Sequence, residues 1–493
     1  MKAHTSEEID RAASLSAIAF EVYRKTTAAR RAALLKAIGQ GIDANRNRLA
    51  EVAQRETALD RDRLQSEITR TVNQCYLFSE LLQEGSWVRA IIDTAEPFRK
   101  PLPKPDLRQL QVALGPVAVF GASNFPFAYS VCGGDTVAAL AAGCPVIYKV
   151  NPGHPDTSDE VAAIMKREVE KHEFHHGTFE LIHGANVEAG MRLTMHPAIK
   201  AVGFTGSLKG GRALFDAAAK REEPIPVYAE MGSTNPVFIL PEILEQKGAE
   251  IAKALAASNT SSMGQFCTNP GIMIKAQGDA ARSFDAIFSE QAANITPAHM
   301  LNEGISLAFH KSVASVSGRH NVSVLTAPSK EEEQKTGAYV FQTTASAFLS
   351  DASLWEEMFG PASIQVTAGT KEEFMSIARA LPGQITASVW GTDNDFVEFH
   401  DLLEYLQLKA GRIIINGVPT GVEVTHAMNH GGPYPATTDS KFTSVGTQSI
   451  YRFTRPVCFQ NYPQHLLPDE LKDSNPQGIV RMVNGRLIKG SFS

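Results

Sequence analysis

The sequence predicts an α/β protein, with a Rossmann-like doubly wound parallel sheet and a second α/β unit. Three observations support this: a helical pattern over residues 1–90, short apolar runs alternating with helix patterns from Gly115, and a second such series at about 235–416. Strands that are apolar throughout and separated by helices are typical of parallel sheets covered on both faces. Ligands of such sheets bind beyond the carboxyl ends of the strands.

The individual elements follow in chain order. Apolar residues recur at three- and four-residue spacing in residues 1–90, as in amphipathic helices. Four prolines at 96–105 exclude a helix interior and predict an exposed connection or an edge hairpin. The last fifty residues or so are rich in turns. Strands are predicted at 117–120, 145–148, 179–182, 201–204, 227–229, 236–240, 272–275, 388–390 and 412–415, and helices at 136–142 and 158–171.

Length, charge and cysteine content limit the kinds of protein that this chain can be. A chain of 493 residues, 43% of them hydrophobic, is long enough for two or three structural regions. The net charge of −6 gives no basic field that would indicate a nucleic-acid partner. Five dispersed cysteines fit a reducing compartment, and none has the spacing of a metal site. No stretch resembles a membrane span or a signal peptide, so we expect a cytoplasmic protein with no membrane partner.

Cys267 is the first candidate for chemistry. It follows a polar turn that contains glycine, at residues 259–265, rather than an apolar helix face. An arbitrary cysteine is more often a buried core residue than a nucleophile. A thiol near a helix N-terminus has its thiolate favoured by the helix dipole. We expect Cys267 to be placed in this way and to act as a nucleophile.

Two polar side chains follow predicted strands. Asn124 lies in the sequence Ser-Asn-Phe-Pro after the strand at 117–120, where its amide could donate to a developing oxyanion. The alternative is a turn-forming asparagine. Glu230 ends the strand at 227–229, where a carboxylate costs free energy unless it is paired or used. A general base that activates water would suit that position.

Residues 203–211 give the cofactor signal. Their sequence, Gly-Phe-Thr-Gly-Ser-Leu-Lys-Gly-Gly, follows a strand and opens a helix pattern, where glycines let the backbone approach a pyrophosphate. The fingerprint Gly-x-Gly-x-x-Gly is absent, so this signal is weak alone. Lys149 closes the preceding strand and could reach an adenosine ribose or its phosphate. Glu357 is either a surface charge at a helix end or a carboxylate that binds a cofactor ribose.

Taken together, these segments resemble the aldehyde dehydrogenase superfamily over essentially the whole chain. Any one of the motifs is weak, but six in the same order are specific. The runs at 417–424 and 431–437 further resemble an NADP-linked branch that contains α-ketoglutaric semialdehyde dehydrogenases and a bacterial fatty aldehyde dehydrogenase. The six motifs are residues 123–126, Lys149, residues 206–211, residues 230–232, residues 264–267 and residues 357–361.

The resemblance implies a role for each site residue. Cys267 would attack the aldehyde carbonyl, and the Asn124 amide together with the Cys267 backbone N–H would hold the thiohemiacetal oxyanion. Glu230 would activate the water that hydrolyses the thioester. Glu357 would bind the nicotinamide ribose, with Phe359 beside the ring. The implied cofactor contacts are Lys149, Gly206, Ser207, Gly211, Glu357 and Phe359.

Two departures from the family pattern bear on cofactor and substrate. NAD-preferring relatives place a glutamate three residues after the strand-end lysine; Pro152 stands there instead, so we expect NADP, with NAD as the alternative. Succinate-type semialdehyde dehydrogenases place a carboxylate-binding arginine eight residues after the oxyanion asparagine, where this chain has Cys132. We expect α-ketoglutaric semialdehyde as substrate. The alternative is a medium- or long-chain fatty aldehyde, received by an aromatic mouth of Phe125, Phe127 and Tyr129.

The resemblance also implies a domain organisation and an assembly. It places a dinucleotide-binding domain at 1–95 and 114–231, and a catalytic domain at 232–435. An oligomerisation element at 96–113 and 436–493 would join subunits into a homodimer or homotetramer. Two other interpretations stay open: a catalytically silent structural protein on the same fold, and a hydrolase that uses Cys267 without a cofactor.

Overall fold

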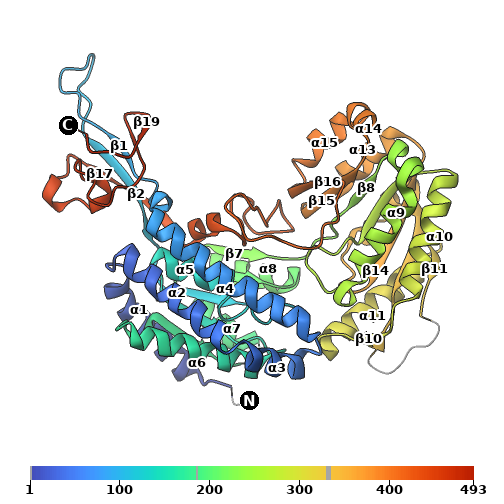
Figure 1. Ribbon diagram of the computed structural model, residues 1–493, viewed down its shortest axis with the longest axis horizontal. Helices are drawn as coiled ribbons and strands as arrows, with labels where there is room; N and C mark the ends of the chain where they lie inside the picture. Colours follow the sequence, from blue (N-terminus) through green and yellow to red (C-terminus); the bar gives the residue numbers. More distant parts are fainter. Residues whose placement is uncertain (1–2, 185–186, 329–334, 493) are drawn as a thin grey trace.

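The computed structural model describes residues 3–184, 187–328 and 335–492. Two α/β lobes lie side by side, and a β arm projects from the N-terminal lobe (Figure 1). The N-terminal lobe contains a five-stranded parallel sheet, the second lobe a seven-stranded sheet, and the arm another five-stranded sheet. The predicted α/β class with a doubly wound parallel sheet is confirmed.

The helical pattern predicted for the first ninety residues is confirmed. The first helix begins with a capping box, in which the Thr5 hydroxyl accepts from the Glu8 N–H and the Glu8 carboxylate accepts from the Thr5 N–H. The apolar faces of the second and fourth helices pack on each other within the largest hydrophobic core. The four helices are α1 (Ser6–Tyr23), α2 (Ala28–Ala44), α3 (Arg46–Thr57) and α4 (Arg61–Glu84).

The five-stranded sheet of the N-terminal lobe has the order β5-β4-β3-β6-β7, with all neighbours parallel. The strand order reverses between β3 and β6, so the loops that follow these strands diverge and leave a crevice at their carboxyl ends. The strands are β3 (Val117–Phe120), β4 (Val146–Lys149), β5 (Phe179–Ile182), β6 (Ala201–Thr205) and β7 (Val227–Glu230). Their helices are α5 (Gly134–Ala142), α6 (Pro155–Lys171), α7 (Val187–Met195) and α8 (Leu208–Ala219).

The seven-stranded sheet of the second lobe has the order β11-β13-β14-β9-β8-β15-β16. The sequence predicted four of these strands, and the structure adds β11, β13 and β14. The interior strand β14 lacks a continuous apolar run because it buries the polar residues Ser363 and Gln365. The strands are β8 (Val237–Ile239), β9 (Ile272–Ala276), β11 (Ser323–Thr326), β13 (Tyr339–Thr344), β14 (Ala362–Ala368), β15 (Gln384–Trp390) and β16 (Ala410–Ile415).

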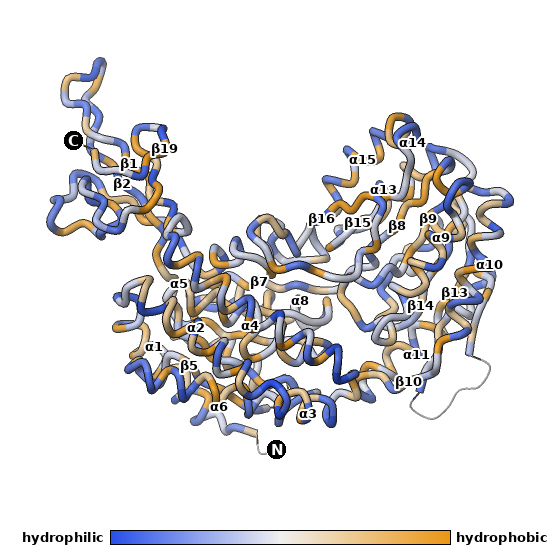
Figure 2. Tube along the Cα trace, viewed as in Figure 1, coloured by the Kyte–Doolittle hydropathy of each residue, from blue (hydrophilic) through white to orange (hydrophobic). Residues whose placement is uncertain are grey.

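Seven α-helices of the described chain accompany the seven-stranded sheet in this lobe. A separate two-stranded ribbon lies beside them. The helices are α9 (Pro241–Thr260), α10 (Asp279–Ala293), α11 (Glu303–Ser317), α12 (Ala345–Ser350), α13 (Lys371–Ala380), α14 (Asp393–Glu398) and α15 (His400–Leu406). The ribbon pairs β10 (Ala298–His299) with β12 (Lys335–Thr336). Figure 2 shows hydrophobic stretches along β8 and β16, within this lobe. Among the described residues, no helix combines the length and the hydropathy that a membrane crossing requires.

The arm is a sheet of order β17-β2-β1-β18-β19. The proline-rich stretch is exposed and connects the antiparallel strands β1 and β2, which confirms the prediction of an exposed connection; the pair itself lies inside the arm sheet, not at its edge. β1 pairs within the arm although it lies inside the predicted range 1–95, and the domain boundaries themselves stay a prediction. The strands are β1 (Ile91–Asp93), β2 (Leu107–Ala113), β17 (Thr454–Gln460), β18 (Arg481–Val483) and β19 (Arg486–Ile488).

Candidate active site

Cys267, Glu230 and Asn124 meet at the junction of the two lobes. Glu230 is the last residue of β7, and Asn124 lies in the loop after β3. Both therefore lie at the carboxyl edge of the parallel sheet, where the sequence placed them. Cys267 comes from the second lobe, between the short helix η3 (Ser261–Gly264) and β9. The junction brings the three predicted catalytic residues together.

The loop that carries Cys267 is fixed by backbone contacts. Gly264 has φ +62°, and a Cβ atom there would lie 2.2 Å from the carbonyl oxygen of Gly360. Only glycine accepts that combination of conformation and close approach. On the other side, the Asn235 amide donates to the carbonyl oxygens of Cys267 at 2.8 Å and Asn269 at 3.0 Å. The nucleophile loop is thus held on two sides by segments of the second lobe before any substrate binds.

The environment of the Cys267 thiol differs from the one predicted. No helix begins at Cys267, so no helix dipole favours its thiolate; the residue lies in a turn. Burial raises the pKa of Cys267 well above its usual value, and the nearby negative charge of Glu230 raises it further. The resting residue is therefore a thiol, and the site has to take its proton before it can attack.

Glu230 is buried but lies among hydrogen-bond donors. Burial alone would raise the pKa of this carboxyl, but His430 and the Ser444 hydroxyl outweigh that effect and lower it. The Glu230 Oε1 atom lies 3.0 Å from His430 Nε2, and Ser444 Oγ donates to Oε2. The structure thus supplies an ionised carboxylate inside the protein, where an unpaired one would be costly.

His430 is a site residue that the sequence analysis missed. Its Nε2 atom lies 3.3 Å from the Cys267 sulfur as well as 3.0 Å from Glu230, and its ring is fully buried. One ligand atom from each of these three residues lies within 4.8 Å of the other two. The available signal was the motif at 431–437, which directly follows His430, but a lone histidine carries no chemical signature.

Asn124 has the placement of an oxyanion donor. Its side chain is buried, and Nδ2 donates to the carbonyl oxygen of Gln265 at 3.0 Å, which leaves the second amide hydrogen for another acceptor. Within the described ranges, the backbone N–H of Cys267 donates to no protein acceptor. Two N–H groups beside the thiol are thus available to one small oxygen atom.

The predicted cofactor residues line the carboxyl edge of the N-terminal sheet. Ser207 is the exposed N-cap of α8, and its hydroxyl accepts from the Gly210 N–H at 3.2 Å. Gly206 is exposed beside it, so this helix terminus is open to an anion. Gly211 is different, because it is buried against Met231, and its missing side chain lets α8 pack closely on β7. Among the described residues, Lys149 has no carboxylate within ion-pair distance, and burial is the one influence on its pKa.

Glu357 and Phe359 lie on the other side of the crevice, beside residues 232–234. A Cβ atom on Gly232 would come within 2.4 Å of a Glu357 carboxyl oxygen. The Glu357 carboxyl keeps some exposed surface, yet the atoms packed around it desolvate it and raise its pKa to about 8, despite a hydrogen bond from the Ser233 N–H. The protein therefore holds a partly protonated acid at the predicted ribose position.

Replacing Glu357 with glutamine is expected to stabilise the cofactor-free protein above pH 7. Because its folded pKa exceeds its unfolded pKa, Glu357 favours unfolding increasingly as pH rises from about 4.5 to about 8. Glutamine keeps the acceptor for Ser233 and removes that cost, roughly 1–3 kcal/mol at pH 8.5. Thermal melts should show a Tm difference at pH 8.5 that shrinks towards pH 5. Equal differences at both pH values would contradict this prediction.

An aromatic mouth lies beside the thiol. The Phe125 ring is 5.1 Å from the Tyr129 ring and 5.7 Å from that of Phe266, the residue before Cys267. The guanidinium of Arg63, on α4, lies 5.0 Å from both the Phe125 and Phe266 rings. The prediction that Phe127 belongs to this mouth is wrong, because Phe127 is buried in the large core beneath the helical layer.

Comparison with known proteins identifies the fold and the family. Residues 1–454 match the aldehyde dehydrogenase family. The chain belongs to that family. It is 44% identical over 487 residues to the α-ketoglutaric semialdehyde dehydrogenase of Acinetobacter baylyi. The aligned residues make up 98% of this chain and 92% of that protein. It is 43% identical over 480 residues to α-ketoglutaric semialdehyde dehydrogenase 2 of Azospirillum brasilense, and the aligned residues make up 97% of this chain and 91% of that protein.

Solved structures agree with this aldehyde dehydrogenase fold. Apo betaine aldehyde dehydrogenase from Staphylococcus aureus superposes with a TM-score of 0.80 at 18% identity, over 94% of this chain and 90% of that one. The 3,6-anhydro-L-galactose dehydrogenase in complex with NAP superposes with a TM-score of 0.79 at 20% identity, over 93% and 92%. The protein is an NAD(P)-dependent aldehyde dehydrogenase, an enzyme that oxidises aldehydes to carboxylic acids.

Proposed function

We propose that this aldehyde dehydrogenase oxidises α-ketoglutaric semialdehyde to α-ketoglutarate, with NADP as the preferred cofactor. The observation that carries the proposal is the 43–44% identity to two α-ketoglutaric semialdehyde dehydrogenases over nearly the full length of the chain. The assembled thiol, carboxylate and amide at the lobe junction support it, because they supply a nucleophile, a base and an oxyanion donor. They also weigh against a catalytically silent protein.

Cys267 begins the reaction by losing its proton. The Glu230 carboxylate is hydrogen-bonded to the thiol and accepts that proton, while the His430 Nε2–H lies 3.3 Å from the sulfur and stabilises the thiolate. Sulfur then forms a bond to the aldehyde carbon, and the carbonyl oxygen becomes an oxyanion. The Asn124 amide and the Cys267 backbone N–H donate to this oxygen, which lowers the barrier in a site partly closed to water.

The cofactor site fits a nicotinamide dinucleotide. Ser207 and Gly206 at the open start of α8 would hold the pyrophosphate, Lys149 the adenosine ribose, and Glu357 with Phe359 the nicotinamide half. Gly211 supports the site by helix packing. Bound there, the nicotinamide supplies the hydride acceptor that the oxidation of the thiohemiacetal requires.

Glu230 completes the cycle at the thioester. It first releases the thiol proton to solvent and then takes a proton from a water molecule. The water oxygen attacks the thioester carbon, the carbon–sulfur bond breaks, and the carboxylic acid leaves with the Cys267 thiolate restored. His430 and Ser444 hold the carboxylate in place for both proton transfers. The same group thus acts as a general base twice, on sulfur and on water.

The NADP preference rests on the surroundings of Lys149. Burial lowers the pKa of this ammonium, and Pro152, which is exposed three residues later, places no carboxylate beside it. A 2′-phosphate on the adenosine ribose would therefore meet a cation with no competing anion.

Replacing Pro152 with glutamate is expected to move the preference towards NAD by about 10- to 100-fold, because a carboxylate accepts from a ribose 2′-hydroxyl and repels a 2′-phosphate. The measurement is kcat/KM for NADP and NAD at a fixed aldehyde concentration. Pro152→Gln is the matched control, since it adds an acceptor without charge. An unchanged NADP/NAD ratio in Pro152→Glu would show that this position does not select the cofactor.

The arm supports a proposal of assembly. It exposes large hydrophobic side chains, among them Phe98 at 91% in the β1–β2 connection and Leu487 at 72% on β19, and its sheet ends in the edge strands β17 and β19. We therefore place the subunit contacts of a homodimer or homotetramer at the arm. Sedimentation velocity of the wild type against a Leu487→Glu variant measures this, with a smaller species expected for the variant and equal species contradicting the placement.

The substrate proposal is tested by following nicotinamide reduction with α-ketoglutaric semialdehyde, pentanal and decanal. We expect kcat/KM for the oxo-acid to exceed that for pentanal, which has the same number of carbons, by at least about 10-fold. A preference for decanal would instead assign a fatty aldehyde to the aromatic mouth. Activity without any dinucleotide would indicate a hydrolase, and no activity at all would indicate a silent protein.

A further inference from the structure

The proposed oxo-acid substrate carries a carboxylate that the protein has to bind, and the inference below rests on that proposed function. Cys132, eight residues after the oxyanion asparagine, cannot bind an anion, because it is buried with its sulfur 3.6 Å from that of Cys75. A buried carboxylate without a cationic or hydrogen-bonding partner would weaken binding rather than strengthen it. The mouth therefore has to contain a different cationic group.

Arg70 reaches the mouth from α4. Its guanidinium lies 5.1 Å from the Tyr129 ring and 5.8 Å from the Phe125 ring, and Nη2 donates to the Tyr129 hydroxyl at 3.1 Å. The Nε–H is buried and has no protein partner. The Phe125 ring in turn lies 5.7 Å from that of Phe266, the residue before Cys267. Arg70 is thus held by aromatic rings on one side and retains donors for another ligand.

Arg412 reaches the same place from the second lobe, on β16. Its two terminal nitrogens donate to the carbonyl oxygens of Gly421 at 3.1 Å and Pro419 at 2.6 Å, which fixes the loop after β16. The Nε–H is buried without a protein partner, as in Arg70. The loop that it fixes continues into Val422, which packs on the apolar cluster around Tyr129. Two arginines from opposite lobes therefore flank the aromatic mouth, Arg70 by direct contact with Tyr129 and Arg412 through the loop that it holds.

Neither arginine is neutralised by an ion pair. Within the ranges that the structure describes, no carboxylate oxygen lies within 4.0 Å of a nitrogen of either side chain. Glu67, one turn before Arg70 on α4, interacts with it electrostatically but forms no direct ion pair, and its Oε1 accepts from the N–H groups of Phe127 and Ala128. A partly buried arginine that forms no direct ion pair is costly, so two of them at the mouth indicate an anionic ligand.

We propose that Arg70 and Arg412 bind the distal carboxylate of the substrate, with the Tyr129 hydroxyl donating to its 2-oxo group. Guanidinium N–H donors match a carboxylate geometrically, and a pair of them from two lobes also fixes the orientation of a short chain. The aldehyde end of the chain then points to Cys267. The aromatic rings of Phe125 and Tyr129 pack on the methylene groups between the two ends. The site thus selects aldehydes of short chain that end in a carboxylate.

The test compares three five-carbon aldehydes in the holoenzyme: α-ketoglutaric semialdehyde, glutaric semialdehyde and pentanal. The readout is the ratio of kcat/KM for each acid to that for pentanal. Arg70→Met and Arg412→Met should each lower both ratios by about 10- to 100-fold, as expected when one charged hydrogen-bonding partner is lost. Arg70→Lys should retain part of the ratio because it keeps the charge, whereas Tyr129→Phe should lower the ratio only for the 2-oxo acid.

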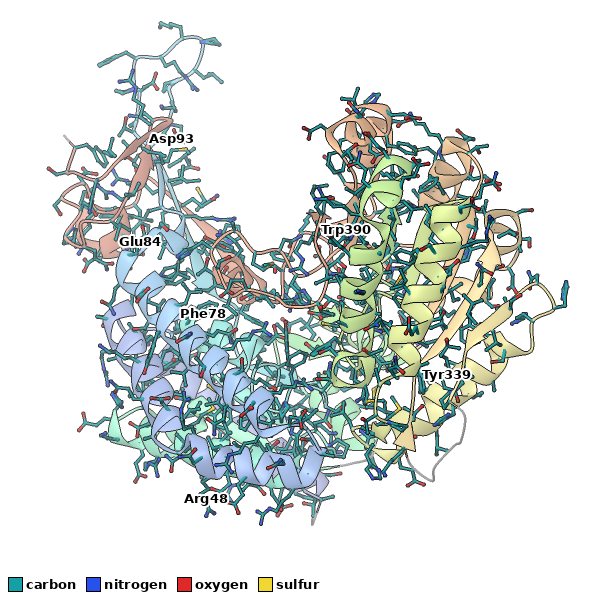
Figure 3. All side chains as sticks on the ribbon, turned by 45° about the vertical axis from the view of Figure 1, so that its right-hand side comes forward. Arg48, Phe78, Glu84, Asp93, Tyr339 and Trp390 are labelled. Atoms are coloured by element: carbon teal, nitrogen blue, oxygen red, sulfur yellow. The ribbon has the colours of Figure 1, made fainter. Side chains whose placement is uncertain are left out.

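The matched control is Arg48→Met, which removes one positive charge elsewhere. Arg48 lies on α3 at the outer surface of the helical layer, paired with Glu160 (Figure 3). This variant should leave both ratios unchanged. If Arg70→Met and Arg412→Met also leave the ratios unchanged, or lower all three activities equally, the two arginines do not bind the carboxylate. If the wild type itself shows no preference for either acid over pentanal, the proposed substrate is wrong instead.

Discussion

Replacing Cys267 with alanine is expected to lower aldehyde oxidation by at least about 10⁴-fold, because no other group near the oxyanion donors can form the bond to the aldehyde carbon. Cofactor binding should persist, since the residues that line the cofactor site lie on other segments. The measurement is single-turnover nicotinamide reduction together with cofactor titration by fluorescence.

The matched control is Cys458→Ala, which removes an exposed thiol on β17, in the arm. It should keep wild-type kcat. Oxidation at a wild-type rate in Cys267→Ala would exclude the thioester mechanism altogether. Loss of cofactor binding in that variant would show that the nucleophile loop, which contacts Gly360 through Gly264, also shapes the ribose site.

Replacing Glu230 with glutamine is expected to lower steady-state turnover by about 10²- to 10⁴-fold, the usual cost of losing a general base. The first turnover should survive. Burial still raises the pKa of Cys267 in this variant, but the loss of the Glu230 charge removes the second cause, so at alkaline pH the thiol can lose its proton to solvent in place of Glu230. Stopped-flow absorbance at pH 8.5 should therefore show a burst of about one reduced nicotinamide per site, followed by slow thioester hydrolysis.

Glu223→Gln is the control for Glu230→Gln. Glu223 is an exposed carboxylate that pairs with Lys200, and its loss should change neither phase. A missing burst in Glu230→Gln would mean that the carboxylate is indispensable for deprotonating the thiol and not only for activating water. A wild-type steady state would show that another base acts on the thioester.

The elements that the sequence predicted well are those whose signal is local. Strands such as β3 are short apolar runs between turns, and Cys267, Glu230 and Asn124 could be found because each follows such an element in a recognisable motif. The strand β14 was missed because its buried Gln365 bonds to Lys275, whose charge pairs with Asp285, so the polar residues that interrupt the pattern are satisfied only in three dimensions.

The missed site residues share a similar cause. His430 is far from Glu230 and Cys267 in sequence, and its role comes only from the distances of 3.0 and 3.3 Å that folding creates. Arg70 lies within an ordinary helix pattern, and Arg412 within an apolar strand, with no motif around either. The expectation for the Cys267 pKa was wrong for a related reason, since burial and the charge of Glu230 outweigh any local turn geometry.

The hydrogen-bond partners of the Glu230 carboxylate are synthesised late, near the end of the chain. These two partners, His430 and Ser444, follow Glu230 by 200 and 214 positions, and the buried ion pair between Asp135 and Arg452 ties their segment back to the first lobe. Domains generally fold in order as they leave the ribosome. Both lobes can thus be in place while the base still lacks its partners, so the catalytic site is complete only when translation is nearly finished.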